Sequence, residues 1–354
     1  MVEVSSTSSK VFTGGSVSVA YGFESAFKTL DGTGIDKSFG LNTKVTGLTL
    51  NTSQVSLNKL GQVEPTKFVF GQQSGSLGIS FVYDDIQAHK VFRCLYELPS
   101  TSVQSGVGTP PVFNYPASLG ENTTATGTPA SLNARVQIQR GSGIITRDLK
   151  GCIVNSIGIS TSIGEVVNGT IDMVFAEEST ADIEAASGTI AAQTSIDSLS
   201  MKPYTFAHGK VKMTTGSTSA MVEVFDIQDI DITFSPNTEL LYGLGSHYAQ
   251  NAFRKVFDIG GRFKTTFKDG ALLQYVIDQS IKTLETETVP EGTGATGQTG
   301  VGLELTFTNG TKKLEIQLGG VSLVDHSSSG LEPNEVLFEE VNFKAKSSYI
   351  KVTA

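Results

Sequence analysis

The sequence predicts a mainly β protein made of two tandem copies of one β domain, each with a single α-helix. Three observations predict this class. Apolar residues alternate with small polar ones over many short runs, helical patterns are few, and the same order of elements occurs twice. The chain has 354 residues, which is the length of two ordinary domains rather than one.

Alternating runs mark the strands. In "SLGISFVYDD", Leu77, Ile79 and Phe81 alternate with mostly small residues, and "NGTIDMVFAEE" alternates in the same way. In "LELTFTNGTKKLEIQLGGVSL", two alternating runs flank the pair Asn309-Gly310. An Asn-Gly pair between such runs is a strong hairpin signal, because it fits the tight turn that joins antiparallel strands. These runs predict strands with one face buried and the other turned to solvent.

Two segments show helical spacing. "DDIQAHKVFRCLYEL" (Asp84–Leu98) places apolar residues on one helical face, and its two aspartates suit a helix start. "DGALLQYVIDQSIKT" (Asp269–Thr283) has the same character. Each segment follows an alternating strand that ends in an aspartate, and this coincidence indicates a repeat.

The repeat extends along both halves of the chain. "GSLGISFVYDD" corresponds to "GGRFKTTFKDG", and "GLTLNTSQVSLNKLGQ" upstream corresponds to "DIDITFSPNTELLYGLG". Downstream, "LKGCIVNSIGIS" corresponds to "QLGGVSLVDHSS", and "EVVNGTIDMVFAEE" to "NEVLFEEVNFKAKS". The similarity lies in order and pattern more than in identical letters.

These matches predict a first domain at residues 1–180 and a second at 199–354, called here the first and second halves. A small, polar linker at 181–198 joins them. Each half contains a long Ser-, Thr- and Gly-rich loop between its helix and its next strand, at Thr101–Ser131 and Glu285–Gly300.

Composition excludes several functional classes. The net charge is −9, so the chain as a whole lacks the Lys and Arg excess with which proteins grip nucleic-acid phosphates. The two cysteines, Cys94 and Cys152, lie in apolar contexts and are expected to be buried thiols rather than a disulfide framework. The N-terminus has no signal-peptide pattern and no run is long and apolar enough to span a membrane, so we expect no membrane association.

The most suggestive stretch for chemistry is "ELLYGLGSHYAQN", residues 239–251, where Ser246 and His247 follow two glycines. It lacks the Lys of a phosphate-binding loop and the nucleophile-elbow pattern, and chain neighbours rarely align as nucleophile and base. The His and Cys residues show no metal-ligand spacing. We therefore predict a turn here, no catalytic, cofactor-binding or metal residues, no cofactor, and a protein that is not an enzyme.

Taken together, the segments resemble a known family. In the second half these are "KPYTFAHGKVKM", "FDIQDIDITFSPNTELLYGLGSHYAQ", "GGRFKTTFKDGALLQYV", "LELTFTNGTKKLEIQLGGVSL" and "EEVNFKAKSS"; in the first half they are "YGFESAFKTLDGT" and "RDLKGCIVNSIGISTSIGEVVNGTIDMVF". They resemble the phage (siphovirus-type) tail tube proteins, in a tandem-domain form.

The resemblance implies two tail-tube-type β-sandwich or barrel domains, each with one helix. Subunits of this family form rings whose inner sheets join into a barrel, and the rings stack into a tube through which DNA passes. Because single-domain members form hexameric rings, two tandem copies imply a trimeric ring with pseudo-sixfold symmetry. The implied location is the virion tail, after assembly in the host cytoplasm.

The implied partners are further copies of the chain and other tail proteins, namely the tape measure, tail terminator and distal tail proteins. Viral DNA would transit the lumen without sequence-specific binding. Tyr242, Leu244 and Tyr248 are apolar groups on an otherwise polar loop, and we predict that they dock on a neighbouring subunit or ring. The alternatives are a β-sandwich virion surface or adhesion protein that forms no tube, and the tube of a contractile injection system.

Overall fold

The computed structural model describes most of both halves, and the statements below refer to the described residues. These are 17–30, 34–35, 37–57, 67–95, 112–115, 130–140, 143–179, 184–185, 201–214, 222–223, 226–267, 272–273, 302–330, 332 and 335–353. They contain strands β1 to β21 and little helix, so the predicted mainly β fold is confirmed.

Four strands of the first half lie side by side in the order β3-β4-β8-β7. Their bounds are β3 (Leu41–Leu57), β4 (Lys67–Val82), β7 (Gly143–Ser162) and β8 (Asn168–Phe175). Along the chain these are the first, second, fourth and third strands of the set. We call this set the first quartet.

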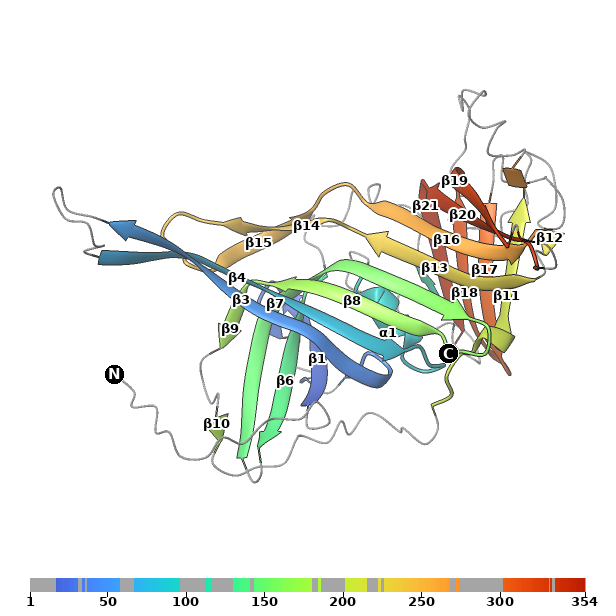
Figure 1. Ribbon diagram of the computed structural model, residues 1–354. Coiled ribbons are helices and arrows are strands. Elements are labelled where there is room, and N and C mark those ends of the chain that lie inside the picture. Colours follow the sequence, from blue (N-terminus) through green and yellow to red (C-terminus); the bar gives the residue numbers. More distant parts are fainter. Residues whose placement is uncertain are drawn as a thin grey trace.

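The second half contains a quartet with the same order, β13-β16-β20-β19. Its strands are β13 (Ile227–Ser235), β16 (Asp258–Thr266), β19 (Ser322–Ser329) and β20 (Phe338–Ala345). The quartets join because β7 and β13 pair antiparallel, from Ser162 opposite Asp229 to Ile157 opposite Phe234. The eight strands therefore form one continuous, open sheet, which faces the reader in Figure 1.

Each quartet is covered on one face by a second layer of strands. Over the first quartet these are β1 (Val17–Ala26), β2 (Thr29–Leu30), β6 (Leu132–Arg140), the beginning of β7, β9 (Glu177–Ser179) and β10 (Glu184–Ala185). Over the second they are β5 (Val112–Tyr115), β11 (Gly209–Thr214), β12 (Val222–Glu223), β17 (Gly302–Asn309), β18 (Lys312–Gly319) and β21 (Ser347–Thr353). The predicted hairpin around Asn309-Gly310 is β17–β18.

A corner glycine carries the chain from the covering layer into each quartet. Gly151 has φ +61° in the middle of β7, and Gly320 has φ +60° between β18 and β19. Residues with a Cβ rarely adopt this left-handed conformation, so glycine permits the turn at both places.

The core lies between the quartets and their covering strands. In the strands between the two edges β3 and β19, alternate residues are buried, as in β8, where Ile171, Met173 and Phe175 are fully buried. Both halves also pack an aromatic ring over a glycine on the neighbouring strand. Phe175 lies opposite Gly75, and Phe343 lies opposite Gly261.

The first of the two predicted helices begins later in the chain than expected. Within the described residues 84–95, the helix is α1 (Ala88–Arg93). Asp84 Oδ1 accepts hydrogen bonds from the Ile86 and Gln87 backbone N–H groups and holds the residues before α1 in a turn. A short 3₁₀ helix, η2 (Phe206–His208), precedes β11. Of the predicted helix Asp269–Thr283, residues 272 and 273 are described and are helical.

Two predicted irregular segments contain strands. The predicted loop Thr101–Ser131 includes β5, which pairs with β21 in the second half. The predicted linker 181–198 includes β10, which pairs with β7. The predicted loop Glu285–Gly300 lies outside the described residues.

Candidate assembly surfaces

The outer ends of β3 and β4 extend beyond the body of the protein (Figure 1). We call residues 49–57 and 67–74 the arm. Its apolar side chains are more exposed than is usual for a surface that stays in contact with water. Phe70, for example, is 60% exposed. The large exposed apolar residues of the arm are Leu50, Val55, Leu57, Phe68, Val69 and Phe70.

A hairpin of the second half lies against this arm. It consists of β14 (Thr238–Tyr242) and β15 (Ala249–Arg254), and its loop is residues 243–248. Tyr242 Oη donates to the Gln73 carbonyl oxygen at 2.9 Å, and the Gln73 N–H donates to the His247 carbonyl at 2.8 Å. His247 Nδ1 also lies 3.0 Å from the Gly71 carbonyl oxygen. The loop that carries Ser246 and His247 therefore forms a contact between the two halves.

Ser246 and His247 are not arranged as a nucleophile and a base. Ser246 Oγ donates to the Tyr248 carbonyl at 2.7 Å and accepts from Gln250 Nε2 at 2.6 Å. The His247 ring instead contacts Gly71. Both side chains thus hold the loop and its contact with the arm.

The three predicted docking residues have different surroundings. Tyr242 is half-buried against the arm, whereas Leu244 is fully exposed at the tip of the loop. Tyr248 is 36% exposed, and Lys28 Nζ lies 5.8 Å from the centre of its ring. Sequence reasoning missed the arm itself. The apolar residues of "QVSL" and "KFVFG" are the sequence feature that could have indicated it.

The two ends of the continuous sheet are β3 and β19. Among the described strands, β3 pairs with β4 and β19 pairs with β20, so each forms an edge of the sheet. An edge strand presents backbone donors and acceptors to any other strand of matching direction, and proteins cover such edges or use them for association. One edge belongs to each half.

A family model of phage tail tube proteins matches residues 14–345, nearly the whole chain. The chain belongs to the phage tail tube protein family. A search of the curated proteins finds no match to it. It is therefore a structural protein of the phage tail, and membership of this family implies self-assembly and association with other tail proteins.

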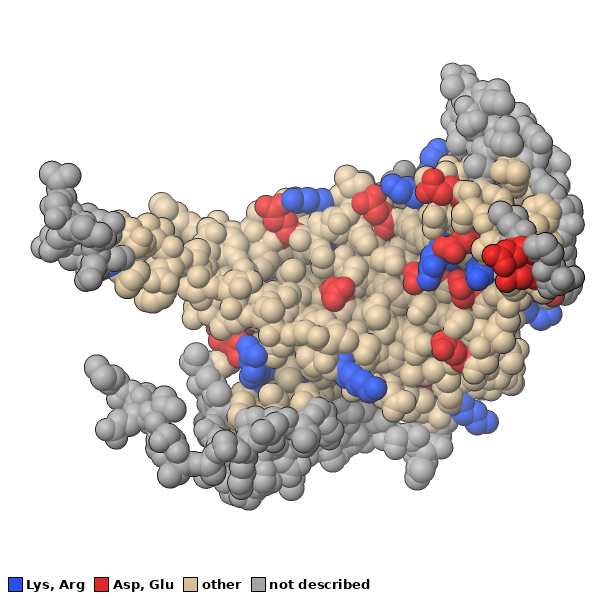
Figure 2. Space-filling view, in the orientation of Figure 1, with Lys and Arg blue, Asp and Glu red and all other residues tan. Residues whose placement is uncertain are grey.

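The sheet face turned away from the core differs between the halves of this tail tube protein. Over β4, β7 and β8 this face consists mainly of Ser, Thr and Gly, including Ser76, Ser156 and Thr170. Over β13, β16 and β20, acidic and basic side chains gather together, at the right of Figure 2.

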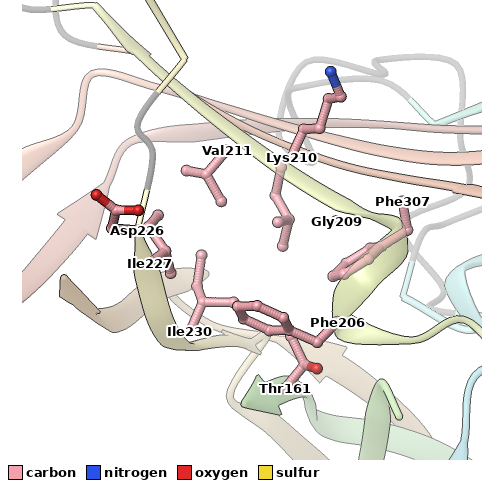
Figure 3. A pocket seen from close by; sticks show the side chains of 10 residues that line it. Thr161, Phe206, Gly209, Lys210, Val211, Asp226, Ile227, Ile230 and Phe307 are labelled. Carbon is pink, nitrogen blue, oxygen red and sulfur yellow. The ribbon is translucent and has the colours of Figure 1, made fainter. Parts of the chain in front are cut away.

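The tail tube protein also has a cavity of about 160 Å³, between β7, β11, β13 and η2. Figure 3 shows Val211 and Ile230 pointing toward this space. Lys210 and Asp226 are the charged residues among those that line it, and the lining contains no His or Cys. The cavity suits an apolar group the size of a side chain.

Both cysteines are free and buried, as predicted. Burial raises the pKa of the Cys94 thiol to about 12 and raises that of Cys152 as well, so both stay protonated and unreactive near neutral pH. The described residues contain no cluster of three or more His, Cys, Asp or Glu side chains suited to a metal ion. Within these same ranges, no helix has the length and apolar character needed to cross a bilayer.

Proposed function

We propose that this protein forms closed rings by pairing β19 of one copy with β3 of the next, and that the rings stack into a tube with a lumen for DNA passage. The observation that supports ring closure is the β7–β13 pairing inside the chain. In this pairing, β7 at one end of the first quartet lies beside β13 at one end of the second quartet. The same junction between copies would extend the sheet without leaving an edge.

Three copies complete the ring in this proposal. Each chain supplies two quartets, so three chains give six quartets and pseudo-sixfold symmetry. A head-to-tail contact of this kind closes only if the rotation from one unit to the next divides a full turn. The two quartets also support a division into tandem domains at 1–180 and 199–354, joined by the linker 181–198.

The internal junction predicts the register of the proposed external one. Within the chain, Gly158 of β7 lies opposite Thr233 of β13. Matching the paired residues of the two quartets strand by strand shows which positions are equivalent. Ser329 of β19 is the equivalent of Gly158, and Asn51 of β3 is the equivalent of Thr233. We therefore expect Ser329 of one copy to lie opposite Asn51 of the next. Both residues are exposed in the single chain.

A cysteine cross-link tests this junction. The variant Asn51→Cys/Ser329→Cys should form disulfides between chains on mild oxidation, because opposite residues in antiparallel strands are about 5 Å apart. The native thiols are buried and should not interfere. On a denaturing gel without reductant, we expect dimers and trimers and no larger species.

The matched control is Ser56→Cys/Ser329→Cys, in which one cysteine moves along the exposed part of β3. It should cross-link far less at the same protein concentration. Equal cross-linking by both variants, or none by either, would contradict the proposed edge pairing. A ladder that reaches six chains would retain the pairing and overturn the trimeric ring.

Stacking of rings is assigned to the exposed apolar side chains of the arm, whose β3 backbone edge takes part in ring closure, and to the loop that carries Tyr242, Leu244 and Tyr248. The exposed apolar side chains at both places support this assignment, because their burial would stabilise a contact between rings. In the tail, the ends of such a tube would contact the tape measure, tail terminator and distal tail proteins. We place its assembly in the host cytoplasm.

A further inference from the structure

The cavity beside the β7–β13 junction is lined by residues from both halves of the chain. It has a volume of about 160 Å³. Strand β13 contributes Ile230, which lies opposite Thr161 of β7. The covering strands contribute Val211 of β11 and its opposite residue Leu305 of β17. Ile230 and Leu305 are both buried, so the cavity lies on the core side of the sheet.

A glycine and two aromatic rings shape this cavity. Gly209 of β11 lies opposite Phe307 of β17, and a Cβ at Gly209 would come within 3.1 Å of the Phe307 ring. Phe206 of η2 supplies the second ring. Figure 3 shows both rings beside the same space. Because aromatic rings pack well face to face and edge to face, this lining favours a flat aromatic ligand.

One polar side chain of the lining can accept a further hydrogen bond or donate one. Thr161 is 4% exposed, and its Oγ1 has no hydrogen-bond partner among the described residues. A buried hydroxyl without a partner costs free energy, which a ligand that hydrogen-bonds to it would recover. Lys210 and Asp226 carry opposite charges, and Figure 3 shows the Lys210 ammonium directed away from the cavity. The lining therefore favours a neutral ligand over an ion.

We propose that this cavity binds one small, neutral aromatic molecule that carries a single hydrogen-bonding group. Apolar cavities of about 150 Å³ hold one benzene-sized molecule. The ring of such a ligand packs against Phe206 and Phe307, and its polar group forms a hydrogen bond with Thr161 Oγ1. The site does not depend on ring closure or stacking, because all of its residues belong to one chain. Phenol is the simplest probe of this class.

Methyl NMR of the full, unassembled chain during a titration with phenol tests the site. The methyl signals of Ile230 and Val211 should shift and then saturate as one phenol binds to each chain. We expect a dissociation constant on the order of 1 mM, which lies within what so few atoms can contribute. A titration that leaves both methyl signals unshifted would overturn the proposal.

Two variants test the contacts, and toluene serves as the matched ligand without a hydroxyl. Thr161→Val removes the hydroxyl of the protein, so it should weaken phenol binding about fivefold and leave toluene binding unchanged. Val211→Phe should fill the cavity and abolish the binding of both ligands. The control Val324→Phe makes the same substitution at an exposed position of β19, and it should bind both ligands as the wild-type chain does.

The amide spectrum of Val211→Phe shows whether this variant folds, and Thr161→Val decides the question if it does not. Equal weakening of phenol and toluene binding by Thr161→Val would overturn the proposal. Phenol binding that persists in a folded Val211→Phe chain would overturn it as well. Tube formation by the same proteins is a separate measurement, so failure of the proposed function would leave this result intact.

Discussion

The two quartets share their strand order but differ in their first two strands. In the first half, β3 and β4 are continuous over 17 and 16 residues. In the second half, the corresponding path is broken into β13 and β14, and into β15 and β16. The break falls at Pro236 and Asn237. Proline cannot donate a backbone hydrogen bond, so it ends a central strand.

Asn237 fixes the bend that follows. It has φ +49°, and its side-chain Nδ2 donates to the Val256 carbonyl at 2.8 Å and to Asp258 Oδ2 at 2.9 Å. The equivalent residues of the first half, Gln54 and Val55, continue β3 into the arm. The repeat thus sets the strand order, while two residues decide whether a hairpin runs straight or bends onto its neighbour.

The largest expected effect comes from the exposed tip of the bent hairpin. Leu244→Asp should abolish tube formation, because it places a charge in a contact that the proposal makes apolar. The thermal midpoint of the unassembled chain should stay unchanged, since Leu244 is fully exposed. Negative-stain microscopy and a thermal melt measure the two effects. Leu244→Met should still assemble, and normal tubes from Leu244→Asp would refute the role of the loop.

The two glycine and aromatic pairs allow the cores of the halves to be compared. A Cβ at Gly261 would collide with the Asp231 backbone carbonyl and the Phe343 ring, whereas at Gly75 its three nearest atoms would all belong to the Phe175 ring. A backbone atom yields less easily than a ring, so Gly261→Ala should cost about 3 kcal/mol of unfolding free energy and Gly75→Ala about 1 kcal/mol. Urea denaturation of both variants checks the order. The reverse order would contradict the packing described.

A buried acid in the first half gives a pH-dependent effect. Burial raises the pKa of Asp84 above its ordinary 3.8. The folded chain therefore holds this proton more tightly than the unfolded chain, and the resulting stability is present at low pH and lost as pH rises through the raised pKa. Asp84→Asn can keep the two Oδ1 hydrogen bonds without the charge.

We expect Asp84→Asn to raise the unfolding free energy at pH 7, by about 1.4 kcal/mol for every unit by which burial raises the pKa of Asp84. The gain should shrink as the pH falls through the raised pKa, where the wild-type carboxyl becomes protonated. Denaturant titrations at several pH values measure this. A gain that grows as the pH falls would show that the assigned direction is wrong.

The smallest expected effect concerns the contact between the halves. Tyr242→Phe removes the hydrogen bond to the Gln73 carbonyl and should cost about 1 kcal/mol of local stability. The amide of Gln73, which donates to His247, should exchange its hydrogen several-fold faster. Unchanged exchange at Gln73 would mean that the arm and the hairpin are held by other contacts.

The alternation of apolar and polar residues made the strands predictable, and the repeated order of elements made the similarity of the halves predictable. A buried acid, however, obscured the residue-by-residue match between the halves. Matching "EVVNGTIDMVFAEE" with "NEVLFEEVNFKAKS" sets Ile171 against Glu340, whereas the strand pairing makes Glu339 its equivalent. Glu339 is buried in a core position, with Oε2 3.0 Å from His326 Nε2. It breaks the apolar pattern there, and a slip of one residue turns every side chain to the opposite face.

The apolar residues Tyr242, Leu244 and Tyr248 could be singled out from the sequence, but the contact of their hairpin with the arm could not. Tyr242 and Gln73 are 169 residues apart, and no local pattern links them. The sequence of the arm predicts an ordinary pair of strands. Nothing in that sequence indicates how far the two strands extend beyond the core. Likewise, β5 lies within a Ser- and Thr-rich segment, and its pairing with β21 depends on a strand far along the chain.

Ring closure is the central claim, and imaging of the assembled protein tests it most directly. Purified protein should form hollow tubes in negative-stain electron microscopy, and mass photometry of single rings should give the mass of three chains. Rings of six chains would contradict the trimeric ring. A dispersed monomer at high concentration, or a solid fibre without a lumen, would contradict closure of the sheet through β3 and β19.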